Sequence, residues 1–169
     1  MPSSFVDSFA PIVKLLVDVA PTRVIDVGPG WSKYGLACRE YLPDLRRLHA
    51  IEVKEGRRPV QDAVYDGVYT GNVLDFRSAQ FWRRWDLVLL VDVIEHLTKR
   101  DGHRVLDCMQ NAGPAVLVAT PKQWIEQYDD NNPYEEHVSH WTGADFACHG
   151  IVADVSTIDA IIYLLEGAG

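Results

Sequence analysis

The chain has 169 residues, with 24 acidic side chains against 16 basic ones and a formal net charge of −8. A chain of this length can sustain one hydrophobic core, so we expect a single domain spanning residues 1–169. The net negative charge repels phosphate backbones and argues against nucleic acid as a general partner. No segment is long enough and uncharged enough to span a bilayer, so we expect no membrane partner.

The cysteines are few, odd in number and widely spaced: Cys38, Cys108 and Cys148. They show neither metal-ligand spacing nor a disulfide framework, so we expect no metal site and a reducing cytoplasm. The N-terminal region, residues 1–20, lacks the basic start and clean apolar run of a secretory signal. We interpret it as helical, opened by Ser3-Ser4, with Pro11 in the first turn of its main helix.

Apolar runs alternate with helical patterns along the chain, which is typical of an α/β fold. Strands are expected at residues 23–27, 47–53, 67–70, 86–92, 115–119, 152–158 and 160–165. Helices are expected at residues 32–41, 61–65 and 78–84, and after capping boxes at Thr98 and Thr142. The N-terminal helix should face inward with Ile12, Val13, Leu16 and Val17. The last two strands lie too close in sequence for a parallel crossover, so they should form an antiparallel hairpin.

The first expected strand ends in the most informative motif, Val-Ile-Asp-Val-Gly-Pro-Gly at residues 24–30. Gly28 and Gly30 permit a tight bend and a close approach of the backbone to a bound molecule. The second strand ends in Glu52, which is placed to accept hydrogen bonds from ribose hydroxyls. These features predict a nucleoside-bearing cofactor at the carboxyl edge of the sheet.

A dinucleotide would be one such cofactor, but two residues weaken this interpretation. The dinucleotide fingerprint needs a third glycine at the position of Lys33. Trp31 also crowds the helix N-terminus that a pyrophosphate would use.

Four landmarks close successive apolar runs: the glycine turn, Glu52, Gly71-Asn72-Val73-Leu74-Asp75 and Asp92-Val93-Ile94-Glu95-His96-Leu97. This series resembles the class I S-adenosylmethionine-dependent methyltransferases, in particular the branch whose fourth strand ends in Asp-Val-x-Glu-His. The resemblance runs from about Arg23 to the C-terminus. It implies a Rossmann-like, seven-stranded, mostly parallel sheet with an antiparallel last strand and helices on both faces, whereas a dinucleotide fold would have a parallel sixth strand. Family members usually carry Gly-Asp at the third landmark, where this chain has Gly71-Asn72.

The resemblance implies an enzyme that binds S-adenosylmethionine and releases S-adenosylhomocysteine. It gives these cofactor roles: Asp26 to the ammonium group, Gly28 and Gly30 to the methionine arm, Glu52 to the ribose, Asn72 and Val73 to the adenine, and Asp92 to the reactive end. The alternatives are local structural roles. Asp26 and Asp92 would be capping residues, Asn72 would be a turn residue, and Glu52 would pair with Lys54.

A long polar segment with interleaved aromatics, residues 120–141, follows the fifth strand. Long loops in compact domains are usually functional, so we interpret this segment as the acceptor-binding loop, too polar to belong to the core. A neutral imidazole can take a proton from an acceptor hydroxyl, which makes His137 the first candidate for a catalytic base and His140 the second. The alternative is that these histidines only fix the loop. His96 is expected to pack or hydrogen-bond locally.

We expect the acceptor to be a small molecule, a saccharide, or a metabolite hydroxyl or amine, bound beneath this loop and the N-terminal helix. The segment 29–34 is also similar to the first motif of ribosomal RNA 2′-O-methyltransferases, which use two lysines. As counterparts of these two lysines, Lys122 falls beyond its strand and Lys14 is only a loose match. RNA methylation is therefore kept as the alternative and not as the main interpretation. A noncatalytic subunit that binds S-adenosylmethionine is the second alternative. The sequence leaves the oligomeric state open.

Overall fold

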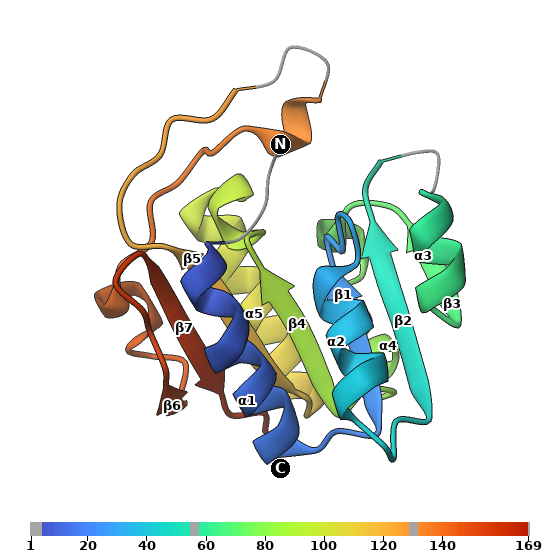
Figure 1. The fold of residues 1–169 in the computed structure, drawn as a ribbon. Helices are drawn as coiled ribbons and strands as arrows, with labels where there is room; N and C mark the ends of the chain where they lie inside the picture. Colours follow the sequence, from blue (N-terminus) through green and yellow to red (C-terminus); the bar gives the residue numbers. More distant parts are fainter. Residues whose placement is uncertain (1–4, 55–57, 129–131, 169) are drawn as a thin grey trace.

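The computed structural model describes residues 5–54, 58–128 and 132–168, so the expected Ser3-Ser4 helix start lies outside the described residues. Within these ranges seven strands form one sheet in the order β3-β2-β1-β4-β5-β7-β6, with helices on both of its faces (Figure 1). Strands β1 to β5 pair in parallel, β7 runs antiparallel to β5, and β6 runs antiparallel to β7. The predicted fold class, including the antiparallel last strand, is confirmed.

The elements agree closely with the expected ranges. The strands are β1 Arg23–Val27, β2 Arg47–Glu52, β3 Gly67–Thr70, β4 Leu87–Val91, β5 Ala115–Pro121, β6 Ile151–Asp154 and β7 Ala160–Leu165. The α-helices are α1 Phe9–Val19, α2 Lys33–Tyr41, α3 Pro59–Val64, α4 Ala79–Trp82 and α5 Lys99–Ala112. Short 3-10 helices are η1 Val6–Ser8, η2 Val73–Asp75, η3 Ile94–His96, η4 Pro133–Glu135 and η5 Gly143–Phe146. None of the described helices combines the length and the apolar character needed to cross a bilayer.

Two expected details are corrected. Strand β6 ends at Asp154, well before the expected residue 158, because the side chain of Asp154 accepts a hydrogen bond from the Ser156 amide and begins a turn. The inward face of α1 carries Leu15 beside the expected Ile12 and Leu16, whereas Val17 is 48% exposed. The 3.6-residue period explains this result, because the helix buries positions three and four residues apart.

The sheet separates two hydrophobic layers. Helices α1, α2 and α3 cover one face, and α4 and α5 cover the other (Figure 1). All five residues of β4 are buried, as expected for a central parallel strand with both faces covered. Val27 in β1 lies level with Ile51 in β2, and it is paired with Leu90 in β4. This register brings the glycine turn, Glu52 and Asp92 to the same edge of the sheet.

The 120–141 segment is not uniformly polar loop, because its C-terminal end enters the core. Trp141 is fully buried, and its Nε1 donates to the carbonyl of Ile94, 3.1 Å away, and to Oγ of Ser139, 2.8 Å away. A Cβ added to Gly102 of α5 would lie 2.3 Å from the indole, so the glycine makes room for this side chain. The prediction that the segment is too polar for the core is therefore wrong at this end.

Candidate functional site

A cavity of about 280 Å³ opens at the carboxyl edge of the sheet. The predicted cofactor residues all line it, namely Asp26, Gly28, Gly30, Glu52, Asn72, Val73 and Asp92. His96 and the loop residues Asn132, Tyr134 and Glu135 also line it. The described part of the N-terminal helical region contributes no residue to this lining.

The two glycines of the turn are needed for different reasons. Both have left-handed backbones, with φ of +68° at Gly28 and +51° at Gly30. A Cβ on Gly28 would lie 2.8 Å from Cγ2 of Val93, so packing also excludes a side chain there. A Cβ on Gly30 would meet no atom within 4 Å. The space beside Gly30 is therefore open for a ligand that passes close to the backbone.

Asp26 is buried near the end of β1, where the hydroxyl of Tyr65 donates to its Oδ2 at 2.6 Å. Burial raises the pKa of Asp26 to about 7, the hydrogen bond from Tyr65 opposes this rise, and the negative charge of Glu52 adds to it. The carboxyl group is thus divided between its neutral and charged forms near pH 7. A bound cation would favour the charged form.

Gln61 connects the glycine turn to Glu52, a role that sequence reasoning missed. Its side chain is buried, and its Oε1 accepts from the Arg58 amide at 3.1 Å. Its Nε2 donates to the carbonyl of Gly30 and to Oε2 of Glu52, both at 3.1 Å. The only signal in the sequence is that Gln61 occupies the third position of a helix that begins with proline, where a side chain often caps the backbone.

Asn72 and Asp92 both line the cavity, and each has a distinctive local structure. Oδ1 of Asn72 accepts a hydrogen bond from the Leu74 amide at 2.9 Å, so Asn72 caps η2 as its alternative interpretation predicted. Asp92 has a φ of +52° although it carries a side chain. Such backbones cost about 1–3 kcal/mol and cluster at functional sites. The strain at Asp92 is consistent with selection for the position of its carboxylate.

Glu95, His96 and His137 form a second polar group beside the cavity. Glu95 is buried, Thr120 donates to its Oε2 at 3.0 Å, and its Oε1 has no hydrogen-bond partner among the described residues. Burial raises the pKa of Glu95 to about 8, and the charge of Asp92 adds to this effect.

The tautomers of the two histidines follow from their carbonyl partners. Nδ1 of His96 lies 2.9 Å from the carbonyl of Glu136, and Nδ1 of His137 lies 2.8 Å from the carbonyl of Ile125. A carbonyl only accepts, so each Nδ1 carries the proton and each neutral ring keeps a lone pair on Nε2. The ring centroids are 4.9 Å apart. His137 does not line the cavity itself, but it contacts His96, which does.

This group has the donors for a divalent metal ion, since the carboxylate and imidazole ligand atoms all lie within 4.8 Å of one another. The sequence predicted no metal, because the three residues come from two segments about 40 positions apart and show no ligand spacing. His140 is placed differently. Its Nε2 lies 2.8 Å from the carbonyl of Lys122, and it does not line the cavity. Of the two candidate bases, the structure brings only His137 next to a lining residue.

No protein-family model matches the chain, and no curated protein sequence matches it. Solved structures do match its fold. The methyltransferase domain of bacterial CtHen1-C has a TM-score of 0.66 at 16% identity, over 95% of this chain and 97% of that one. The N-terminal domain of EvdMO1 with SAH bound has a TM-score of 0.66 at 11% identity, over 98% and 82%. CalO1, a methyltransferase in calicheamicin biosynthesis in its SAH-bound form, has a TM-score of 0.61 at 19% identity, over 96% and 54%.

The chain has the class I methyltransferase fold. Its seven-stranded, mostly parallel sheet and antiparallel β7 are those that the resemblance implies. A dinucleotide-binding fold would need a parallel strand in place of β7, so that alternative is wrong for the architecture. Within the methyltransferase fold, the cavity lies at the edge where the parallel strands end and the loop rises above them (Figure 1).

The buried Asp26 predicts a specific dependence of stability on pH. Its folded pKa of about 7 exceeds the ordinary 3.8, so the folded chain binds a proton more tightly than the unfolded chain. The free energy of unfolding should then fall between about pH 4 and 7, by an amount on the order of 4 kcal/mol from this group. Asp26→Asn should remove this part of the fall and leave the part due to Glu95, whose pKa is also raised, whereas the exposed control Asp44→Asn should keep both. Urea unfolding at a series of pH values measures both, and identical profiles for wild type and Asp26→Asn would contradict the assignment.

Proposed function

We propose that this chain is an enzyme that transfers a methyl group from S-adenosylmethionine to a hydroxyl or amine of a small molecule or saccharide, releasing S-adenosylhomocysteine (SAH). One observation carries the proposal: a single cavity joins the glycine turn, Glu52 and Asp92 to His96 and to the loop residues 132–135. Two neighbours that share the fold have SAH bound, which supports the choice of cofactor.

The cavity residues fit this cofactor. Asp26 offers a buried carboxylate to the ammonium group, whose positive charge would hold it ionised. The open space beside Gly30 suits a methionine arm running close to the backbone. Glu52 is half-buried, and among the described residues each of its oxygens receives one hydrogen bond, Oε1 from the Lys54 amide and Oε2 from Gln61. Lone pairs on both oxygens remain for a ribose diol. Asn72 and Val73 line the wall on which the adenine would lie.

When bound, the cofactor supplies a methyl group on a sulfonium, which is already a good leaving group. The chain therefore has to position the acceptor and receive its proton. Holding two reactants in line can supply roughly 7–11 kcal/mol of a barrier. We assign acceptor binding to the loop residues 120–141 and the proton to Nε2 of His137, whose ring centroid lies 4.9 Å from that of the cavity residue His96. His140 ranks second, because its Nε2 is occupied by the Lys122 carbonyl and it lies apart from the cavity lining.

The same group offers a second way to activate an acceptor. Oε1 of Glu95 is buried and lacks a hydrogen-bond partner among the described residues, and one carboxylate oxygen of Glu95 lies within 4.8 Å of ligand atoms of His96 and His137. A divalent cation held there would act as a Lewis acid on the acceptor oxygen. His137 would then serve as a ligand and not as the base.

The RNA alternative has less support from the site. Lys122, the candidate catalytic lysine, donates through Nζ to the carbonyl of Thr157 and does not line the cavity. Lys33 does line it, but the net charge of −8 opposes a phosphate backbone. A noncatalytic subunit would have the same cofactor cavity, so only turnover separates it from an enzyme.

The proposed function is tested by measuring SAH binding calorimetrically and then transfer of a labelled methyl group. We expect SAH to bind, and label to pass to a member of an acceptor set of saccharides, hydroxylated metabolites and amines. Label on an RNA oligomer, with affinity falling steeply between 50 and 200 mM salt, would instead support RNA methylation. SAH binding without transfer to any acceptor would indicate a noncatalytic subunit. Absence of SAH binding by folded protein would contradict all three.

Gly30→Ala tests whether the ligand passes over the turn. Alanine at a φ of +51° should cost about 1–2 kcal/mol of stability, although no protein atom obstructs its Cβ. Gly150→Ala is a matched control, with a φ of +60° and a nearest contact of 3.8 Å outside the cavity. Both variants should lose similar stability, but only Gly30→Ala should lose SAH affinity, by about tenfold or more as overpacking of a filled site predicts. Equal SAH affinities in Gly30→Ala and Gly150→Ala would show that the ligand does not pass over Gly30.

His137→Gln tests the assignment of the base. Removing a general base should slow methyl transfer about 100-fold or more and leave SAH affinity unchanged. The pKa of His137 lies below the ordinary value because the ring is partly buried and faces His96, so the neutral base should persist to mildly acidic pH. Wild-type rates should rise with pH through that pKa, and the variant should lose this rise. A wild-type rate abolished by chelation and restored by Mg²⁺ or Mn²⁺ would assign His137 as a ligand, and an unchanged rate in the variant would exclude both roles.

A further inference from the structure

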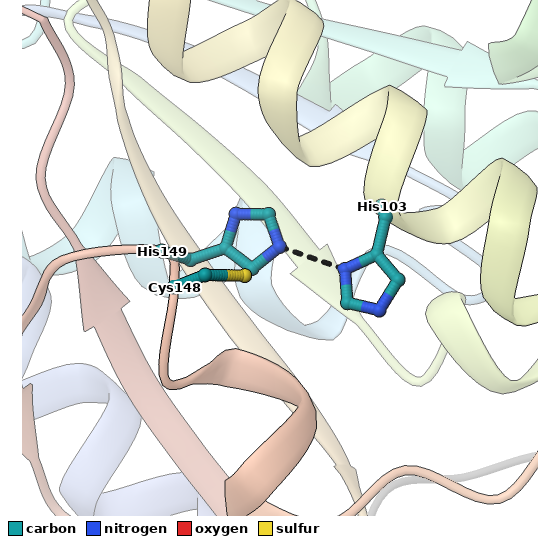
Figure 2. A group of neighbouring side chains, drawn as sticks. All are labelled: His103, Cys148 and His149. Atoms are coloured by element: carbon teal, nitrogen blue, oxygen red, sulfur yellow. Dashed lines mark hydrogen bonds between the residues drawn. The ribbon is translucent and has the colours of Figure 1, made fainter.

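A second cluster of metal-ligating side chains lies outside the cavity, where α5 meets the segment that leads into β6 (Figure 2). It consists of His103 on α5 and of Cys148 and His149, three and two positions before Ile151. One ligand atom from each side chain lies within 4.8 Å of the others. None of the three residues lines the cavity, so the cluster is separate from the proposed methyl-transfer site.

Gln110 fixes the orientation of the buried His149 ring. Nε2 of Gln110 donates to the carbonyl of His149 at 2.7 Å and to the carbonyl of Glu166 at 2.6 Å, which determines how its amide is turned. Its Oε1 therefore faces Nδ1 of His149 at 2.8 Å, and this nitrogen must carry the proton. Nε2 of His149 is left with a lone pair, and it points at His103 (Figure 2).

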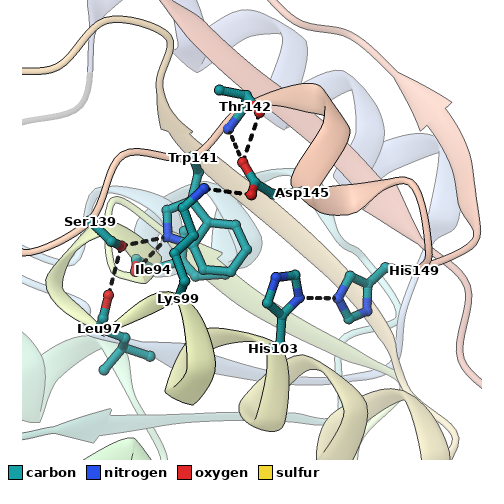
Figure 3. Close-up of polar contacts among 9 residues, drawn as sticks. All are labelled: Ile94, Leu97, Lys99, His103, Ser139, Trp141, Thr142, Asp145 and His149. Carbon is teal, nitrogen blue, oxygen red and sulfur yellow. Dashed lines mark hydrogen bonds and ion pairs between the residues drawn. The ribbon is translucent and has the colours of Figure 1, made fainter.

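His103 presents its Nδ1 to the same point. The two nitrogens are 2.9 Å apart and the ring planes differ by 12°, so in the free protein Nδ1 of His103 donates to His149. The other side of His103 packs on the buried Trp141, with ring centroids 5.0 Å apart (Figure 3). Moving the proton of His103 from Nδ1 to Nε2 keeps the ring neutral and turns both facing nitrogens into ligands.

The arrangement also has the outer contacts of a metal site. A ligating histidine usually donates its other N–H to an amide, carbonyl or carboxylate, as His149 does to Gln110. Oδ1 of Asp107 lies 3.7 Å from the same nitrogen. Burial lowers the pKa of His149, so the ring stays neutral and available near pH 7. The thiol of Cys148 is free and exposed, which leaves it able to rotate toward the two rings.

We propose that His103, Cys148 and His149 bind a zinc ion, with water as the fourth ligand. Two imidazoles and a thiolate are donors that suit zinc, and its bond lengths place tetrahedral ligands about 3.3–3.7 Å apart. The two nitrogens then need to separate by only about 0.4 Å from their hydrogen-bonded distance. On binding, the Sγ–H bond of Cys148 breaks, an Sγ–Zn bond forms, and the proton leaves to solvent without any redox change. The sequence predicted no metal because the ligands come from segments 45 positions apart, with only Cys148 and His149 adjacent.

Co²⁺ is the probe for this site, added to the full chain after dialysis against a chelator. We expect a thiolate-to-cobalt charge-transfer absorption that saturates at one cobalt ion per chain and that Zn²⁺ abolishes. About one proton should be released per metal ion bound at this site, measured by calorimetry in buffers of different ionisation enthalpy. The Glu95, His96 and His137 group has no sulfur, so it cannot produce this absorption.

Matched cysteine variants locate the sulfur ligand. Cys148→Ser should abolish the charge-transfer absorption, whereas Cys108→Ser, which changes the other accessible cysteine, should keep it. His103→Ala should weaken Zn²⁺ binding by more than the roughly 10–100-fold lost when an outer partner is removed. Zn²⁺ should raise the melting temperature of the wild type and of Cys108→Ser by more than that of Cys148→Ser.

An absorption that is absent in the wild type, or that survives in Cys148→Ser, would overturn the proposal. If Cys148→Ser does not fold, the response of His103→Ala to Zn²⁺ decides. A melting temperature that Zn²⁺ raises equally in that variant and in the wild type would also overturn the proposal. These outcomes do not depend on whether the chain transfers methyl groups, because none of them measures turnover.

Discussion

The parallel register of β1 between β2 and β4 is the constraint on which the candidate site depends. Val27 is level with both Ile51 and Leu90, so three strands end together, and the residue that follows each end is directed to one edge. Side chains 66 positions apart in sequence, from Asp26 to Asp92, thereby line one cavity. Gln61 reinforces this alignment, because it hydrogen-bonds the turn after β1 and the carboxylate at the end of β2 at the same time. The position of the Glu52 carboxylate is thus tied to the conformation of the glycine turn.

Trp141 fixes the C-terminal end of the 120–141 loop, as Gln61 fixes the glycine turn. Its indole is buried beneath η3 and donates to the carbonyl of Ile94, which fixes the loop end next to the Glu95-His96 pair. Lys99 lies 5.0 Å above the ring and forms an ion pair with Asp145 at 2.5 Å, so the next segment is held as well (Figure 3). The same indole packs on His103. One aromatic residue therefore connects the Glu95-His96 segment beside the cavity with the cluster of His103, Cys148 and His149.

The sequence predicted the features that are encoded locally. Gly28 and Glu52 stand directly at strand ends, and the strand that precedes each is recognisable from its apolar run, so their meeting at one edge follows from parallel pairing. Tyr65 could not be predicted, since its partner Asp26 is 39 positions away and nothing nearby marks the contact. Trp141 was misjudged for a related reason, because its neighbours in sequence are polar while its neighbours in space, 47 positions away, are core residues. Long-range side-chain contacts are therefore the part of the site that hydrophobic periodicity and turn residues in the sequence do not predict.

The electrostatics of the site explain why a cationic ligand suits it. Asp26 and Glu95 are both buried, and desolvation raises the pKa of each, to about 7 and about 8, so both resist ionisation in the free protein. Neighbouring carboxylates, Glu52 for the first and Asp92 for the second, increase that resistance. A ligand carrying an ammonium and a sulfonium would reverse the balance, because each positive charge stabilises the ionised form of a nearby acid. Binding of such a ligand should therefore release protons near neutral pH, and loss of its sulfonium charge on methyl transfer should weaken one of the interactions that hold it.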